Sequence, residues 1–444
     1  MNIEKILEML ENRRFRELKS MLDNLHPVDI AELISEIEEK QIILIFRLLD
    51  KDIAAETFAE MNGELREILI NALTDTEIEE VMAEMYLDDM ADVLEEMPAN
   101  VVDRLIMATD EETRAQVNLL LQYPEDSAGS IMNVEYITLN KEMTVEDAIL
   151  KIRQVGINKE TIYTCYVTEQ RKLIGVVSLK ELLTTGDNHL IEDIMETNVF
   201  YVHTHDDQEE VASLIDKYDL IAIPVVDNEM RMVGIVTVDD AIDVMQEETT
   251  EDMSVMAGIV VPCEESYFET GVKKHAKSRF PWLLFLMLSA TISGLVLGHF
   301  EATLIAMPIL NTFVPMLTGT GGNCGSQSST LIIRGLATNE IKFKDIFKVI
   351  AKEVVVAAIV GVMLAIVNGI RILLMYHNPM LAFVLGLTLI CTVILAKTIG
   401  CMLPLIAKKC GLDPALMAAP LITTLVDTGT IFVYFMIATK IFHI

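Results

Sequence analysis

The hydrophobic and polar positions divide this chain into two parts near residue 280. From Trp282 onward, five apolar stretches are each long enough to cross a hydrocarbon core about 30 Å thick. These stretches are 282–303, 309–333, 349–375, 381–406 and 414–439. The pattern predicts an all-α membrane domain of five helices over 280–444. Four spans with one buried or re-entrant segment are the alternative.

The first 125 residues place apolar side chains at helical spacing and repeat a short acidic motif. Its copies are DIAELISEI (29–37), DIAAETFAEM (52–61), EIEEVMAEM (77–85) and DMADVLEEM (89–97). Each copy opens with an acid that can cap a helix. We expect an all-α, superhelical N-domain of short helices over 1–125, with its methionines filling the core rather than binding ligands.

Residues 126–245 contain a longer internal repeat. The pair Ile-Met recurs after 63 residues (131–132 and 194–195), and GVVS (175–178) returns after 59 residues as GIVT (234–237). Short β-branched runs bounded by turn residues predict strand, helix, strand, strand, helix in each copy. This order resembles a pair of CBS domains, over about 126–186 and 187–245.

The CBS resemblance implies a candidate adenosine-nucleotide site. In such pairs an Asp three residues after Ser or Thr holds the ribose hydroxyls, and Thr237 with Asp240 fits this spacing. The first copy departs from it, with Ser178 and Glu181, and Tyr163 completes the candidate set. A phosphate-binding glycine run is missing from the sequence, so ATP is the weaker ligand expectation.

Residues 246–279 begin acidic and end basic, which is typical of a linker. We expect a connecting, plug-type helix from about 242 to 257 and a second segment that leads into the first span. This linker is placed to transmit movement of the cytosolic domains to the membrane domain.

Charge is segregated along the chain in the same way as hydropathy. Residues 1–270 hold 61 of the 67 acidic and 20 of the 34 basic residues, a net charge of −41, whereas residues 271–444 carry +8. A domain at −41 would be repelled by phosphate backbones, so a nucleic-acid partner is excluded, and cations would be attracted. The opening MNIEKILEMLENRRFRELK reads as a charged helix rather than a signal peptide, which favours a cytosolic location.

Two other chemistries are disfavoured by the sequence. The six cysteines form neither a C-x-x-C motif nor a cluster with histidine, which argues against zinc and a disulfide framework; they are Cys165, Cys263, Cys324, Cys391, Cys401 and Cys410. A nucleophile, base and orienting group do not occur together, and no G-x-x-x-x-G-K-[ST] appears, so we expect no enzyme and no catalytic residues.

Loop charges predict the orientation of the spans. Basic residues gather before span one (273–279), between spans two and three (334–348) and at Lys408 and Lys409. The loops 299–302 and 376–379 have no Lys or Arg. By the positive-inside rule the N-terminus and CBS pair are cytoplasmic and the C-terminus lies outside a multi-pass cell membrane protein.

Polar residues inside the spans mark the candidate cation path, because they are costly in lipid. Asp427 lies mid-span without a basic partner in its own helix; Lys397 and Glu353 are lesser candidates. Candidate lining residues are Gly319, Thr320, Gly322, Asn323, Thr423 and Thr424. Two Asp427 side chains across a two-fold axis could hold a largely hydrated Mg²⁺, which predicts a homodimer.

Taken together, GTGGNCGSQSSTLIIRGLA (319–337), DPALMAAPLITTLVDTG (413–429) and the domain order resemble the MgtE family of magnesium channels. The resemblance covers essentially the whole chain. It implies a homodimeric Mg²⁺-selective pore with Asp427 as the pore acid, closed by cytosolic Mg²⁺. The sensor acids that it implies are Glu56, Asp88, Asp92, Asp207, Glu209, Asp219, Asp240, Asp243, Glu248, Glu251, Asp252 and Asp413.

Two other functions remain open from the sequence. One is a carrier that exchanges a divalent cation for H⁺ or Na⁺, since polar, glycine-rich spans also occur in carriers. The other is a membrane scaffold that senses Mg²⁺ or nucleotide without transport.

Overall fold

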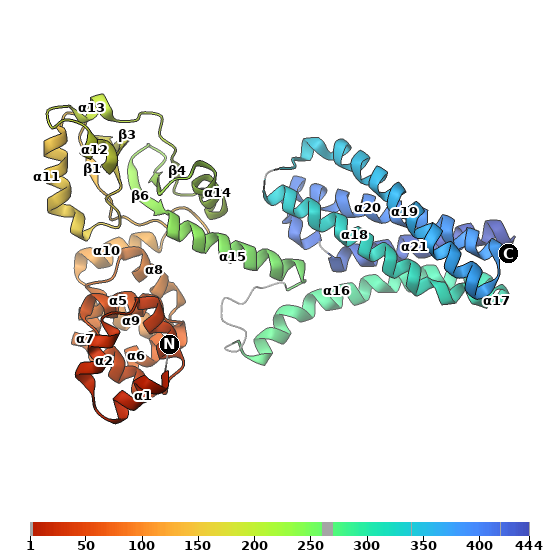
Figure 1. Cartoon of the computed structure of the whole chain (residues 1–444), viewed down its shortest axis with the longest axis horizontal. Coiled ribbons are helices and arrows are strands. Elements are labelled where there is room, and N and C mark those ends of the chain that lie inside the picture. Colours follow the sequence, from red (N-terminus) through yellow and green to blue (C-terminus); the bar gives the residue numbers. More distant parts are fainter. Residues whose placement is uncertain (1–2, 260–269, 339, 418, 444) are drawn as a thin grey trace. The chain divides into compact units, whose positions relative to one another are not determined.

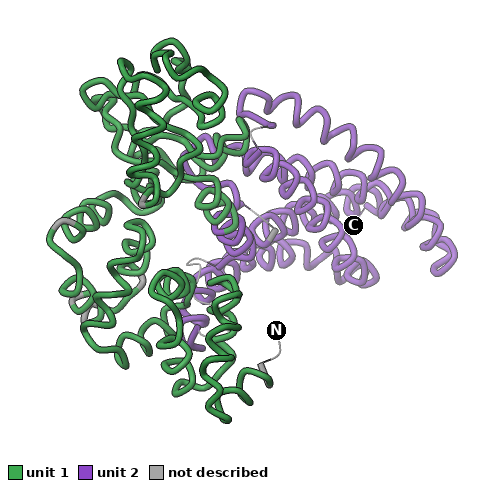
Figure 2. Tube along the Cα trace, turned by 60° about the vertical axis from the view of Figure 1, so that its left-hand side comes forward, with its two compact units in different colours: residues 1–246 green, residues 247–444 purple. Residues whose placement is uncertain are grey.

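A computed structural model describes residues 3–259, 270–338, 340–417 and 419–443. The chain forms two compact units, Met1–Gln246 (unit 1) and Glu247–Ile444 (unit 2), shown in different colours in Figure 2. Cys165, Cys324, Cys391, Cys401 and Cys410 are free thiols, and Cys263 lies outside the described residues.

Unit 1 begins with ten short helices (Figure 1). They are α1 (Ile3–Glu11), α2 (Phe15–Leu22), α3 (Pro27–Ser35), α4 (Glu39–Phe46), α5 (Lys51–Ala59), α6 (Gly63–Ala72), α7 (Asp75–Met82), α8 (Leu87–Glu96), α9 (Ala99–Ala108) and α10 (Glu111–Leu120). Local chemistry sets several starts: Thr74 and Glu77 form a reciprocal capping box on α7, and Asn62 caps α6. The four acidic motifs of the sequence fall on α3, α5, α7 and α8.

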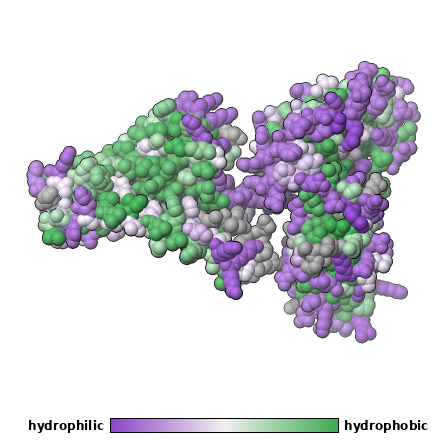
Figure 3. All heavy atoms as spheres, turned by 180° about the vertical axis from the view of Figure 1, so that it is seen from behind, coloured by the Kyte–Doolittle hydropathy of each residue, from purple (hydrophilic) through white to green (hydrophobic). Residues whose placement is uncertain are grey.

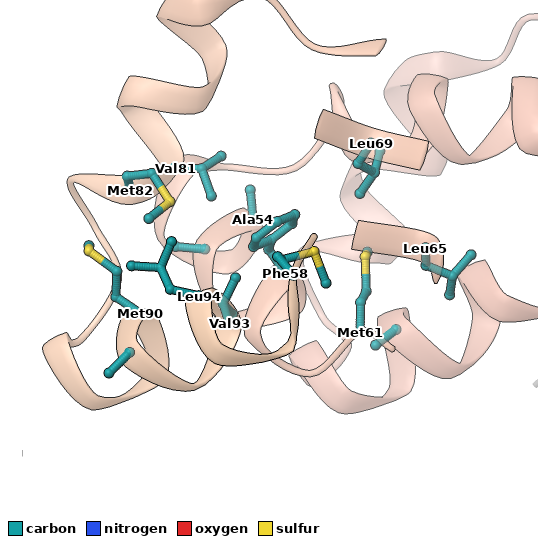
Figure 4. Close-up of a cluster of buried hydrophobic side chains, with 14 of the residues drawn as sticks. Ala54, Phe58, Met61, Leu65, Leu69, Val81, Met82, Met90, Val93 and Leu94 are labelled. Carbon is teal, nitrogen blue, oxygen red and sulfur yellow. The ribbon is translucent and has the colours of Figure 1, made fainter. Parts of the chain in front are cut away.

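Alternate helices of this N-domain stack on one another, α3 on α5, α5 on α7 and α7 on α9. Met61, Met82 and Met90 are at most 2 % exposed and belong to the same cluster of buried apolar side chains as Phe58 and Leu94 (Figure 4). The prediction that these methionines belong to the core is confirmed. Ion pairs about one repeat apart tie the surface of the stack, among them Arg47–Glu77 and Arg104–Asp75, both at 2.8 Å.

The rest of unit 1 is two copies of one α/β module. The first holds β1 (Thr138–Leu139), α11 (Val145–Val155), the 3-10 turn η1 (Gly156–Asn158), β2 (Thr164–Glu169), β3 (Lys172–Ser178), α12 (Leu179–Thr184) and the short α13 (Ile191–Ile194). The second holds β4 (Val202–His203), α14 (Gln208–Tyr218), β5 (Ala222–Val226), β6 (Met232–Thr237) and α15 (Val238–Met256). In each copy the first strand pairs parallel with the second, which pairs antiparallel with the third. The predicted order of elements is confirmed.

The linker differs from the prediction in one respect. The connecting helix expected from 242 is the continuation of the last helix of the second copy, because α15 runs unbroken from Val238 to Met256. Residues 260–269 of the linker lie outside the described residues, and α16 begins at Val272. The basic segment 273–279 is therefore the first two turns of α16.

Unit 2 is all-helical in its described residues. It consists of α16 (Val272–His299), α17 (Glu301–Ala306), η2 (Pro308–Phe313), α18 (Val314–Ala337), η3 (Phe343–Asp345), α19 (Ile346–Tyr376), α20 (Pro379–Lys409), η4 (Pro414–Met417) and α21 (Ala419–Phe442). Within the described residues, four segments are long and apolar enough to cross a membrane: Val272–His299, Phe343–Tyr376, Pro379–Lys409 and Pro414–Phe442. Many of their large apolar side chains are exposed, such as Leu295 and Leu374, and colour the surface of this unit green in Figure 3.

Helix α18 coincides with the expected second span but is not among the four apolar segments. Its 24 residues include the polar run 318–330, which lowers its hydropathy. The helix packs against both α20 and α21. This packing places one side of the polar run inside unit 2, beside the helices that carry the other polar candidates.

Candidate functional site

One face of α18 is buried through unusually close helix contacts. Gly322 lies against Thr423 of α21, where an added Cβ would come within 2.8 Å of the threonine methyl. Gly400 of α20 meets the carbonyl of Gly325 so closely that a Cβ there would overlap it. Small residues at these crossings allow the backbones to approach, as is common in membrane helices.

The other face of α18 is open. Gly319, Asn323, Gln327 and Thr330 are exposed and recur three or four positions apart, so they share one side of the helix. Among the described residues, nothing lies within 4 Å of the position that a Cβ of Gly319 would take. We call these four residues the α18 polar stripe. A single copy of the chain leaves it uncovered.

Asp427 is half-buried on α21, at the level where the α18 polar stripe begins. Ile422 contacts the position of Gly325, and Thr430 contacts that of Gly321, so the two helices run in opposite directions. One turn along α21 from Thr423 to Asp427 therefore matches one turn back along α18. Within the described part of unit 2, no basic side chain forms an ion pair with Asp427, and Lys397 pairs with another acid.

A hydrogen bond next to Asp427 joins the first and last membrane helices. Ser293 Oγ of α16 and Thr428 Oγ1 of α21 are 2.5 Å apart. Thr428 follows Asp427 directly, and α16 is the helix that follows the linker. This hydrogen bond can transmit a movement of α16 to Thr428, the residue next to Asp427.

The other predicted lining residues differ in their surroundings. Gly319 and Asn323 lie on the open stripe, whereas Gly322 and Thr423 pack against each other. Thr423 and Thr424 both donate their hydroxyls to the carbonyl of Pro420 (2.9 and 3.0 Å), and half-buried Thr320 donates to the carbonyl of Met316 (2.7 Å).

The two lesser candidates form a buried ion pair. Lys397 Nζ of α20 lies 3.3 Å from Glu353 Oε2 of α19 and donates to Ser328 Oγ of α18 at 3.0 Å. Ser328 in turn donates to Glu353 at 2.6 Å. Lys397 is thus paired with Glu353 inside the helix bundle.

A second site lies in unit 1, where acids of the N-domain and of both CBS copies converge. Asn133 is fully buried and donates from Nδ2 to Asp88 Oδ2 (2.9 Å) and to Glu160 Oε2 (3.1 Å). The other carboxylate oxygen, Asp88 Oδ1, is buried without a hydrogen-bond partner among the described residues. Asp240 of α15 acts electrostatically on Asp88 from the second copy. We call Asp88, Asp89, Asp92, Glu160 and Asp240 the acidic cluster.

Burial and mutual repulsion raise the carboxyl pKa values of this cluster. Burial first, and then the charge of Asp240, raise the pKa of Asp88 to about 6. The same two causes, with Asp88 as the main neighbour, raise the pKa of Asp89 to about 7 and that of Glu160 to about 8. Asp92 has a pKa of about 7 for these reasons, although its side chain still reaches solvent. Such crowding of like charges disfavours the compact arrangement unless protons or cations neutralise it.

Two of the cluster's members and its central amide were missed from the sequence. Asp89 and Glu160 were not predicted as sensor acids, and neither was Asn133. Glu160 is 72 residues from Asp88 along the chain and belongs to the first CBS copy, so only the fold brings the two together. For Asp89 the signal was present, as the second acid of the pair 88–89.

Glu248, Asp252 and Asp413 form a smaller acidic group in unit 2, and we call them the linker acids. Burial, then the charges of Asp413 and Glu248, raise the pKa of Asp252. In unit 1, burial and the charge of Asp239 raise the pKa of Asp243. Exposed Glu56 acts electrostatically on Tyr86, together with Glu160 and Asp88, so it lies at the edge of the acidic cluster. Glu251 is exposed on α15.

The remaining predicted sensor acids have roles at helix ends. Asp207 caps α14 by accepting a hydrogen bond from the amide of Glu209 (2.9 Å), and both side chains are exposed. Asp219 ends the same helix in a left-handed conformation, with φ of 52°. The structure does not bring these three into the acidic cluster.

The predicted nucleotide residues also occupy helix starts. Ser178 and Glu181 form a capping box on α12, and Thr237 Oγ1 donates to Asp240 Oδ2 at 2.7 Å where α15 begins. The aromatic ring of Tyr163 is exposed. Within the described residues, no three His, Cys, Asp or Glu side chains are arranged to hold a bare metal ion.

Family models match three parts of the chain. A family model for MgtE, described as a divalent cation transporter, matches residues 314–437. The MgtE intracellular N domain matches 25–126, and CBS domains match 128–186 and 191–247.

Two relatives match over nearly their whole length. The magnesium transporter MgtE of Thermus thermophilus is 37% identical over 97% of this chain and 96% of its own. That of Bacillus subtilis is 34% identical over 99% of this chain and 97% of its own. Among solved structures, the cytosolic domain of the Mg²⁺ channel MgtE in complex with ATP aligns with a TM-score of 0.52 at 38% identity, covering 55% of this chain and 99% of that one.

Proposed function

This chain belongs to the MgtE family of divalent cation transporters, and from this premise we propose that it is a homodimeric magnesium channel of the cell membrane. Mg²⁺ moves inward through it down the electrochemical gradient, and cytosolic Mg²⁺ closes it. The relatives described above are named magnesium transporters, which supports Mg²⁺ as the transported ion.

The observation that carries this proposal is the uncovered α18 polar stripe at the level of Asp427. Polar groups are costly against lipid, so this face requires water, an ion or another protein surface. A second copy related by a two-fold axis would cover the stripe and bring two Asp427 side chains towards each other. On this reading α18 is the fifth span, held inside the assembly rather than in contact with lipid.

Half-exposed carboxylates separated across an axis suit Mg²⁺ in its hydrated form. The ion sheds its water reluctantly and prefers octahedral oxygen ligands. Two Asp427 side chains would neutralise its charge through water, while Gly319 and Asn323 offer room and polar atoms along the path.

Passive conduction is sufficient to drive uptake. A divalent ion gains about 4.6 kcal/mol on moving inward down a membrane potential of about 100 mV. This corresponds to about three decades of accumulation at equilibrium. Such a pathway needs a brake rather than an energy source.

We assign the brake to the acidic cluster and to the linker acids. Without Mg²⁺, the crowded carboxylates repel and the compact arrangement of unit 1 is disfavoured. Hydrated Mg²⁺ between them would offset this repulsion and stabilise the compact form. Because α15 carries Asp240 at one end and Asp252 near the other, the same helix reports on both acidic groups.

ATP is a second ligand that we propose for the CBS pair. Support comes from the spacing of Thr237 and Asp240 and from the relative solved with ATP. ATP should raise the melting temperature of the full chain, and Asp240→Asn should remove this effect while Glu192→Gln, at an exposed acid of α13, keeps it. Equal responses of both variants would contradict the assignment.

Reconstituted protein tests the pore itself. Proteoliposomes with an inside-negative potential and no H⁺ or Na⁺ gradient should take up Mg²⁺, and Asp427→Ala should abolish uptake without loss of the folded protein. Glu340, an exposed acid between α18 and α19, serves as a control, since Glu340→Ala should leave uptake unchanged. Normal uptake by the Asp427 variant would exclude the pore, and uptake only with a counter-ion gradient would favour a carrier.

A further inference from the structure

The rear of the polar helix α18 is tied to two neighbouring helices by a closed set of polar contacts. Lys397 of α20 contacts both Ser328 and Glu353, and Ser328 donates to Glu353 of α19. Ser328 is fully buried, Lys397 is 5% exposed, and the side chain of Glu353 is 12% exposed. We call these three residues the Lys397 triad. Each of the three helices contributes one member.

The close crossing of α18 and α20 brings the triad together. Gly325 and Gly400 touch through their backbones. Ser328 lies one turn after Gly325 and Lys397 one turn before Gly400, so both point into the same contact region. With larger residues at the crossing, the hydroxyl and the ammonium group would be too far apart to bond.

The triad lies on the side of α18 away from the polar stripe. At 100° per residue, Ser328 is about 140° round the helix from Asn323. The front of the helix is open, and its rear is held through Ser328, which bonds to both members of a charge pair between α19 and α20. Rotation or sliding of α18 would break the hydrogen bonds that Ser328 forms with Lys397 and Glu353.

Association of the helices alone does not require a charge pair at this position. Apolar side chains of similar volume often stabilise an interior at least as well as a buried ion pair. What a charge pair adds is one defined arrangement of α19 and α20, because any other arrangement leaves a charge unpaired in an apolar environment. Ser328 bonds to both charged side chains and so sets α18 against this arrangement.

We propose that the Lys397 triad positions α18, fixing the rotation and depth at which Gly319 and Asn323 face the cation path. Lys397, Glu353 and Ser328 are positioning residues that do not touch the ion. This inference rests on the proposed function, since it presumes that cations pass along the front of α18.

The test is Mg²⁺ flux through the reconstituted full chain, with its half-saturating concentration and its Mg²⁺/Ca²⁺ selectivity. Glu353→Gln and Lys397→Met should each lower the flux about ten-fold or more and reduce the selectivity, because small displacements of a positioned group are costly. The swapped pair Glu353→Lys with Lys397→Glu, and the conservative Lys397→Arg, should restore much of both. Lys348→Met is the matched control, since Lys348 is an exposed residue of α19 whose ion pair, with Asp345 at 3.5 Å, lies at the surface.

Each outcome decides the proposal. Single variants that keep wild-type selectivity and half-saturation, with only a lower melting temperature, would show a purely structural pair and overturn it. If the single variants do not fold, the swapped pair and Lys397→Arg decide the matter. Failure of both to restore selective flux would also overturn the proposal. Wild-type flux that does not depend on Asp427 would instead refute the proposed function, whatever the triad variants do.

Discussion

The side-chain amide of Asn133 lies 2.9 Å from the carboxylate of Asp88. This contact joins the first CBS copy to the N-domain at the place where the acidic cluster forms. The same amide reaches Glu160, so one neutral group separates two carboxylates that would otherwise repel directly. The acidic cluster has no basic member, so in the compact form of unit 1 its carboxylate charges are not neutralised within the cluster.

The first prediction concerns pH. The carboxyl pKa values of Asp89 and Glu160 lie near 7 and 8 in the compact form, above their ordinary values of 3.8 and 4.5. The compact form therefore binds more protons than an opened one between about pH 4 and 8, and its stability falls as the pH rises through this window. Without Mg²⁺, the full chain should resist proteolysis within residues 1–246 better at pH 5.5 than at pH 8. Saturating Mg²⁺ should remove most of this difference, whereas an equal pH response with and without Mg²⁺ would contradict the account.

A second prediction concerns the linker acids. Asp252 and Asp413 repel each other in unit 2, so a bound cation would stabilise their approach. The double variant Asp252→Asn with Asp413→Asn should leave Mg²⁺ flux high at cytosolic concentrations that close the wild type. Glu301→Gln, just beyond the opposite end of α16, is the control and should close normally. Unchanged inhibition in the double variant would remove these acids from the sensor.

The third prediction concerns coupling between α16 and α21, the helix that carries Asp427. Removing the hydrogen bond between Ser293 and Thr428 costs about 1 kcal/mol, which corresponds to about a five-fold change in the equilibrium between open and closed states. Ser293→Ala should shift the half-inhibiting Mg²⁺ concentration by about this factor. Thr291→Ala should not, because Thr291 donates to a carbonyl of its own helix. Equal behaviour of the two variants would argue against coupling by this contact.

A fourth prediction concerns the surface of unit 1 that would join two copies in the proposed homodimer. Leu183 and Ile242 occupy matching positions in the two CBS copies and are 66% and 51% exposed. Val155 and Tyr218 form a second matching, exposed pair. We expect these surfaces to meet in the homodimer, so Ile242→Cys should cross-link between copies with a short bis-maleimide in a Cys410→Ser background. Leu119→Cys, at an equally exposed leucine of α10, is the control, and cross-linking no faster than in this control would contradict the prediction.

Local patterns were sufficient to predict the order of domains and elements. The repeat around GVVS and GIVT fixed the α/β modules, because its alternation of apolar residues has few other solutions. The methionine stripes of the N-domain were correctly assigned to the core for the same reason. A boundary was harder: the end of β6 at Thr237 starts a single long helix, and nothing in the acidic sequence from 238 to 256 marks where the domain ends and the linker begins.

The sites could be predicted only where one segment contains the signal. Asp427 stands out because a carboxylate within an apolar helix is unusual. The pairing of Lys397 with Glu353 spans three helices, and the contact between Asp88 and Asn133 spans two domains, so both depend on the fold. The roles in binding Mg²⁺ or ATP that the sequence suggests for individual residues stay predictions.

Single-channel current in inside-out patches is the decisive measurement for a Mg²⁺ pore closed by Mg²⁺, since the cytosolic face can then be bathed in chosen Mg²⁺ concentrations. With Mg²⁺ as the only permeant cation, we expect inward current whose open probability falls steeply as cytosolic Mg²⁺ rises. We also expect that Asp427→Ala carries no current. An open probability that does not change with cytosolic Mg²⁺, or no Mg²⁺ current at any concentration, would contradict the proposed function.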